Sequence, residues 1–92
     1  MDMNPIFARR LYLAWLVDQL ERPNVPMLMK HTGWPRRTIQ DVLKALAGIG
    51  IELSFVQDGV RHNDGYYQVC DWGPVNRLWV IDQQAQIQAA IS

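Results

Sequence analysis

A tight turn between two apolar stretches limits what this chain can fold into more than any other feature of its sequence. Gly33 suits the left-handed conformation that ends many helices, and Pro35 suits the first turn of a helix. Trp34, between them, is held extended by the proline that follows it. The sequence therefore predicts two short helices joined by a turn, one over residues 26–32 and one over residues 35–48.

A longer helix is predicted before this pair, from its cap at Asn4 to about residue 22. Pro5 can occupy its first turn without losing a hydrogen bond, and Pro23 ends it. The apolar stripe of this helix is wider than one packing face requires. The connection after it could contain a minimal strand at Val25.

The spacing of apolar residues changes after residue 50. Apolar and polar residues now alternate in two segments, as they do in half-buried strands. The apolar members are Ile51, Leu53, Phe55, Tyr67 and Val69. Asp-Gly pairs at 58–59 and 64–65 are turn signals, so we expect a β-hairpin with a projecting tip, the wing, over residues 58–65. A last helix is predicted over residues 74–91.

The expected order is three helices, two strands and one helix, which is the order of a winged helix-turn-helix. Its class is mainly α with a small β-hairpin. The 92 residues are enough for one domain, and we expect residues 1–92 to form it.

The helix predicted over residues 35–48 has two different faces. Four apolar residues fall on one side of a helical wheel and can hold it to the domain. Arg37, Gln40, Asp41 and Lys44 fall on the other side, with Arg36 at the flank. Arginine can pair with guanine and glutamine with adenine in the major groove, so this division suits a helix that reads DNA.

Charge along the chain is segregated, although the formal net charge is zero. Residues 22–44 contain five basic side chains and a single acid, Asp41, whereas most of the acids lie elsewhere. Taken on its own, helix 35–48 is better explained as a core helix with an ordinary solvated face. The turn before it and the hairpin after it favour DNA recognition.

Two stretches of the sequence resemble those of a known protein family. The first, "HTGWPRRTIQDVLKALAGIGI", resembles the helix-turn-helix core of bacterial winged-helix regulators, with Pro35 where many relatives carry a capping serine. Together with "FVQDGVRHNDGYYQVCDWGPVN", it is similar to a family of small, mostly uncharacterised bacterial winged helix-turn-helix proteins. The resemblance covers nearly the whole chain, and by analogy it implies binding to double-stranded DNA and a role in transcription regulation.

The candidate DNA-binding residues come from three segments. Helix 35–48 is expected in the major groove, with Arg37, Gln40 and Lys44 as its base or groove contacts. Arg36 and Lys30 are expected on phosphates, and the wing on the DNA backbone or in the minor groove. The candidate residues are Lys30, Arg36, Arg37, Thr38, Gln40, Lys44, Arg61 and His62. A plain solvated loop remains an alternative for the wing, because Asp58 and Asp64 flank its tip and would repel phosphate.

The last helix has two apolar patches. One contains Val75, Leu78 and Trp79, and the other contains Val80, Ile87 and Ile91. If one patch packs on the domain, the other needs a partner. We therefore expect a homodimer through the C-terminal and first helices, the alternative being a monomer whose tail packs on its own domain.

Other functions find little support in the sequence. His31, His62 and Cys70 match no zinc spacing, and no arrangement of a nucleophile and a base is proposed, so we expect no metal, no cofactor and no enzyme. A single cysteine and the lack of a long apolar run predict a cytoplasmic protein without a membrane span. The alternative function is a protein-interaction module that kept the fold without binding DNA.

Overall fold

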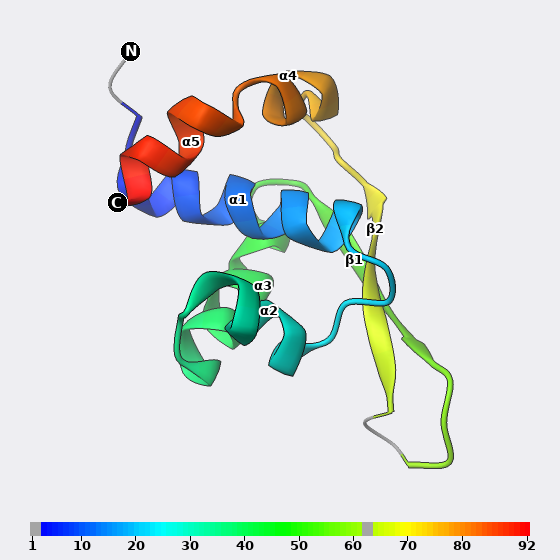
Figure 1. Ribbon diagram of the computed structural model, residues 1–92. Coiled ribbons are helices and arrows are strands. Elements are labelled where there is room, and N and C mark those ends of the chain that lie inside the picture. Colours follow the sequence, from blue (N-terminus) through cyan, green and yellow to red (C-terminus); the bar gives the residue numbers. More distant parts are fainter. Residues whose placement is uncertain (1–2, 62–63) are drawn as a thin grey trace.

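The computed structural model describes residues 3–61 and 64–92. Three helices come first, a two-stranded hairpin follows, and two short helices end the chain (Figure 1). The elements are α1 (Pro5–Gln19), α2 (Val25–Thr32), α3 (Arg36–Gly48), β1 (Glu52–Gln57), β2 (Gly65–Asp71), α4 (Arg77–Asp82) and α5 (Gln84–Ile91). The mainly α class with one hairpin is confirmed.

Helix α1 begins where the sequence predicts. The Asn4 side chain accepts hydrogen bonds from the backbone N–H groups of Ile6 and Phe7 at 2.8 and 3.1 Å. The helix ends at Gln19, earlier than expected, because Leu20 takes an extended conformation and Arg22 a left-handed one. The chain therefore leaves the helix before Pro23 would have broken it.

The turn between α2 and α3 is the predicted one. Gly33 has a φ of 75°, and its N–H donates to the carbonyl oxygen of Met29 at 2.8 Å. Thr32 fixes the same corner, because its hydroxyl donates to the carbonyl oxygen of Leu28 and accepts from the N–H of Trp34. Pro35 occupies the N-cap position of α3, which begins one residue later.

The expected minimal strand at Val25 is wrong, because Val25 begins α2. Asn24 caps that helix by accepting from the N–H of Met27 at 2.9 Å. Just before it, the buried Pro23 accepts a hydrogen bond from the backbone N–H of Tyr67 at 2.8 Å. The connection between α1 and α2 thus contacts the hairpin through the residue before the cap.

The hairpin pairs β1 and β2 in antiparallel register, with Phe55 opposite Tyr67 and Gln57 opposite Gly65. The rings of Phe55 and Tyr67 are 5.1 Å apart in an edge-to-face arrangement. The hairpin extends beyond the helices (Figure 1).

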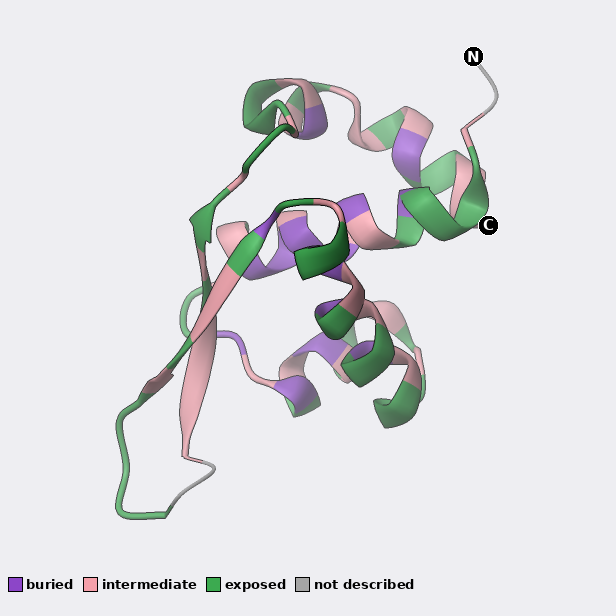
Figure 2. Ribbon diagram, turned by 180° about the vertical axis from the view of Figure 1, so that it is seen from behind, coloured by how far each residue is buried: buried purple, intermediate pink, exposed green. Residues whose placement is uncertain are grey.

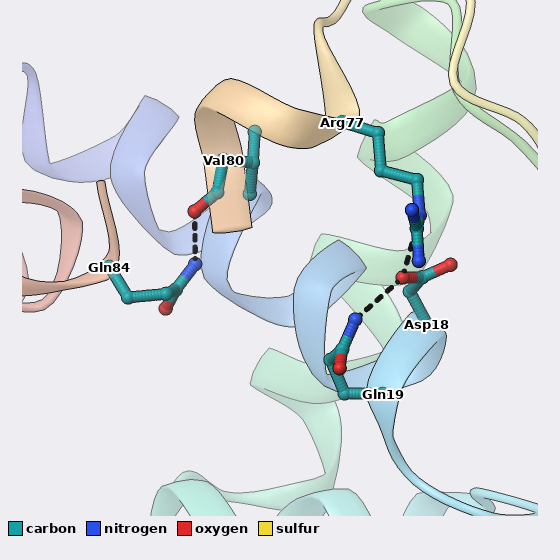
Figure 3. Close-up of polar contacts among 5 residues, drawn as sticks. All are labelled: Asp18, Gln19, Arg77, Val80 and Gln84. Carbon is teal, nitrogen blue, oxygen red and sulfur yellow. Dashed lines mark hydrogen bonds and ion pairs between the residues drawn. The ribbon is translucent and has the colours of Figure 1, made fainter. Parts of the chain in front are cut away.

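The single helix predicted over residues 74–91 is wrong. The chain instead forms α4, capped by the side chain of Asn76, and α5, with a break at Gln83. In a continuous helix the carbonyl oxygen of Val80 would pair with the backbone N–H of Gln84. Here it accepts from the side-chain Nε2 of Gln84 at 2.8 Å, which stabilises the break (Figure 3).

Helix α1 lies between two hydrophobic cores and contributes side chains to both. This accounts for the wide apolar stripe predicted for it. One core joins it to α2, α3 and Ile51, and a second core joins Ala8 and Leu11 to Val80 and Ile87. Figure 1 shows α4 and α5 on one side of α1 and the other helices on the opposite side. Figure 2 shows buried residues within the helices and exposed residues at 58–61 of the hairpin loop.

One of the two apolar patches predicted for the last helix packs on the domain itself. Val80 and Ile87 are both fully buried against α1 of the same chain. An ion pair between Arg77 and Asp18, 3.0 Å from Nε to Oδ2, also fastens α4 to the end of α1 (Figure 3). The exposed large hydrophobic residue of α4 and α5 is Leu78.

Candidate nucleic-acid interface

Helix α3 has the two faces that the sequence predicts. Ile39 and Leu46 are fully buried, and Leu43 is nearly so. The side chains on the opposite face are exposed, and they are Arg36, Arg37, Gln40, Asp41 and Lys44. Thr38 is half-buried between the two faces. The helix is therefore held by one side and presents long polar side chains on the other.

Arg37 and Asp41 form the one ion pair on this face among the described residues. The distance from Nε to Oδ2 is 3.9 Å, and the side chains are 92% and 67% exposed. Exposed pairs at this spacing contribute little to stability, because water screens the two charges. The guanidinium of Arg37 is accordingly accessible to a ligand.

Lys30 lies in the last turn of α2, beside the turn that leads into α3. Its side chain is exposed, as is that of His31. Lys30 thus adds a positive charge near the amino-terminal end of α3, where the free backbone amide groups favour anions.

The wing presents Arg61 at an ordered corner. The N–H of Arg61 donates to the carboxylate of Asp64 at 3.1 Å, and its carbonyl oxygen accepts from the side chain of Gln57 at 3.2 Å. Arg61 and its neighbour Val60 are exposed. His62, also predicted to bind DNA, lies outside the described residues.

The two acids that flank the wing tip are both engaged. Asp58 pairs with Arg22, whose guanidinium also lies over the ring of Tyr66, and Asp64 accepts the hydrogen bond from Arg61. Their repulsion of phosphate is thereby reduced, because one charge has a counter-charge and the other is hydrogen-bonded to an amide. The same pairing removes Arg22 from the cations that are free to meet DNA.

A concave surface separates α3 from the hairpin. It consists of two hollows of about 620 and 670 Å³, both of which are lined by Gln40 and Tyr67. Phe55 and Arg36 also line the second hollow. Sequence reasoning assigned Phe55 and Tyr67 only to strands. The alternation of polar and apolar residues places both on one face of the hairpin. The local sequence does not indicate that this face is directed towards α3.

Charge on this concave surface is mixed. Lys44 lines one hollow together with Glu52, and Arg36 lines the other together with Asp64. Arg36 and Lys44 therefore share the concave surface with acids, so positive charge is not continuous there.

Metal-binding groups are not gathered in the described part of the chain. Across residues 3–61 and 64–92, no three histidine, cysteine, aspartate or glutamate side chains are placed to hold an ion together. Cys70 is exposed on β2, with its Sγ 3.1 Å from the hydroxyl oxygen of Ser54. None of the described helices is long and apolar enough to cross a bilayer.

Comparison with known proteins agrees with this geometry. The family described as winged helix-turn helix matches residues 2–91. A crystal structure of a DUF2131 family protein from Shewanella amazonensis SB2B is similar to this chain, with 46% sequence identity and a TM-score of 0.85. The similarity covers 95% of this chain and 84% of the other. No curated protein matches. On its sequence and its fold alike, the chain belongs to the winged helix-turn-helix family.

Proposed function

We propose that this domain binds double-stranded DNA and acts as a small transcriptional regulator in the cytoplasm. The family to which the chain belongs suggests DNA binding in general. The observation that carries the proposal for this chain is the division of α3 into a buried apolar face and an exposed face with Arg37, Gln40 and Lys44. A helix that enters the major groove needs this division, because it must be held rigidly while its donors and acceptors reach the bases.

The exposed residues of α3 have different roles in this proposal. Arg37 pairs with a guanine through its two parallel donors, and Gln40 pairs with an adenine. Arg36, Lys30 and Thr38 contact phosphates at the amino-terminal end of the helix, and Lys44 follows the groove. Base contacts supply the sequence preference, whereas the phosphate contacts fix the position of the domain on the duplex.

The wing is proposed to contact the neighbouring backbone or minor groove through Arg61, with His62 beside it in the sequence. Arginine is favoured in a narrow minor groove because the potential there is strongly negative. The ordered corner at Arg61 supports this role, since a fixed main chain lowers the entropy lost when the side chain binds.

We also propose a homodimer that spans two half-sites, as helix-turn-helix proteins commonly do. The contact would use α1 and the C-terminal helices, where Ile6 and Leu78 are exposed by 61% and 66%. Ile87 is excluded from that contact, because it is buried within its own chain.

A protein-interaction module is the second candidate function. One observation favours it: the hollow between α3 and the hairpin has an apolar lining that includes Leu43, Ile51 and Leu53, next to the opposite charges of Lys44 and Glu52. Such a surface fits a peptide with mixed charge better than it fits a phosphate backbone.

Binding to a library of random duplexes at several salt concentrations distinguishes the two functions. DNA binding predicts enrichment of related sequences and a log–log salt slope of about −0.9 for each phosphate contacted. A variant in which Arg36, Arg37 and Lys44 become alanine should lose both. Arg10→Ala, which removes a single cation from α1, should keep both the enrichment and the salt slope. If the unmodified protein enriches no sequence and binds no duplex at low salt, the DNA proposal is wrong and the second candidate is favoured.

A further inference from the structure

We infer that Arg22 is a positioning residue that holds the wing against the connection between α1 and α2, and so fixes how Arg61 meets DNA. The inference rests on the proposed DNA binding. It concerns a residue that binds no DNA itself in this scheme, although it is a cation on the same part of the molecule. We call Arg22, Pro23, Asp58, Tyr66 and Tyr67 the wing clasp.

The side chain of Arg22 contacts the hairpin on both sides of its loop. It forms an ion pair with Asp58, the residue after β1, and its guanidinium carbon lies 4.9 Å from the ring centroid of Tyr66 on β2. The Asp58 side chain is only 29% exposed, so water screens this pair less than it screens the pair on α3. Arg22, in the connection between α1 and α2, thus joins the two sides of the hairpin at the base of the wing.

The backbone of the connection supports the same contact. Among the described residues other than glycine, Arg22 is the one with a positive φ, at 52°. L-residues seldom adopt this conformation, and they keep it where surrounding contacts enforce it. The next residue, Pro23, is buried and accepts from the N–H of Tyr67 at 2.8 Å. Side-chain and main-chain contacts at successive residues therefore hold the connection to the hairpin.

Hydrogen bonds continue from the clasp to the tip of the wing. The N–H of Asp58 donates to the carbonyl oxygen of Asp64 at 3.1 Å. Asp64 in turn exchanges two hydrogen bonds with Arg61, one through its carboxylate and one through its N–H, both at 3.1 Å. Arg61 is therefore linked to Arg22 through Asp58 and Asp64, and loosening the first contact should loosen the presentation of the last.

A direct phosphate contact by Arg22 is the competing account. It predicts that Arg22 and Arg61 contribute independently to DNA binding, because separate phosphate contacts add. The clasp predicts instead that the contribution of Arg61 depends on Arg22. The two accounts therefore differ in the additivity of the substitutions, whatever the size of each effect.

The test is a double-mutant cycle of Arg22→Ala and Arg61→Ala on a random-sequence duplex, with the salt slope measured for each protein. In the presence of Arg22, Arg61→Ala should reduce the magnitude of the slope by about 0.9. In the protein that already carries Arg22→Ala, the further substitution Arg61→Ala should leave the magnitude of the salt slope almost unchanged. Asp58→Asn, which breaks the ion pair but keeps Arg22, should also diminish the effect of Arg61→Ala. Arg10→Ala should leave that effect intact.

Amide hydrogen exchange of the DNA-free protein gives a second, independent readout. Arg22→Ala and Asp58→Asn should each speed exchange at Tyr67 and Asp58 and leave the α3 amides unchanged. The inference would be overturned if the effects of the two substitutions on the salt slope were additive and amide exchange at Tyr67 and Asp58 were unchanged. If Arg22→Ala fails to fold, Asp58→Asn decides through the same two measurements. If the unmodified protein binds no duplex, the proposed function fails, while exchange still shows whether the clasp holds the hairpin.

Discussion

The Nε atom of Arg37 lies 3.9 Å from Oδ2 of Asp41, one helical turn further along the exposed face of α3. The cation precedes the acid, which is the less favourable order for such a pair on a helix. Both side chains are also largely exposed. Arg37 can therefore leave Asp41 for a base at little cost.

Arg37→Ala should lower the preference for one base pair by about 1–3 kcal/mol, because the contact proposed for Arg37 is a double hydrogen bond to guanine. Arg37→Lys should not restore it fully, since lysine lacks the planar pair of donors. Binding to selected and mismatched duplexes measures this effect. Thermal stability should be nearly unchanged. Melting of the Arg37→Ala protein at a clearly lower temperature, or unaltered discrimination, would make this arginine structural or merely solvated.

Asp41→Ala should strengthen binding to every duplex, because it removes a negative charge from the face proposed to meet DNA and frees Arg37 from its partner. The change in stability should stay within about 0.5 kcal/mol, as is usual for an exposed position. Anisotropy titrations at constant salt provide the measurement. Weaker binding would instead mean that Asp41 holds Arg37 in the orientation that reads the base.

Arg61→Ala should weaken binding to all duplexes about equally and reduce the magnitude of the salt slope by about one, the expectation for one phosphate contact. The relative order of preferred sequences should stay the same. An unchanged slope would leave the wing without a role on DNA.

Ile87→Ala should destabilise the domain by about 2–5 kcal/mol, because the side chain is fully buried between α5 and α1. Ile87→Asp should cost more, since it buries a carboxylate without a partner. Urea denaturation measures both. A fully stable Ile87→Asp protein would contradict the packing of α5 on its own chain.

Leu78→Asp should convert the proposed homodimer to a monomer without loss of stability, because Leu78 is 66% exposed. Light scattering at micromolar concentration gives the oligomeric state. An unmodified protein that is already monomeric under these conditions would end the dimer proposal.

Local signals account for what could be predicted from the sequence. Asn4 caps α1 and Gly33 ends α2 because each effect depends on neighbours within a few residues. The two faces of α3 also follow from its own periodicity. The break between α4 and α5 could not be predicted in this way, since the sequence there contains neither glycine nor proline and the bond from Gln84 to Val80 stabilises it.

Contacts between distant residues account for the rest. The burial of Ile87 depends on α1, at the other end of the chain. Arg22 looked like part of a basic DNA-binding segment, but the fold pairs it with Asp58 and Tyr66. The concave surface lined by Tyr67 likewise needs the hairpin to lie against α3, which no local pattern determines.

Mapping a duplex onto the protein by amide chemical shifts tests the central claim most directly. Titration of the isotope-labelled domain with a duplex selected from the random library should perturb the amides of α3 from Arg36 to Lys44 and those around Arg61. The amides of α5 should change little, because that helix lies on the far side of α1. Perturbations centred on α4 and α5, with α3 unaffected, would contradict the claim that α3 enters the major groove.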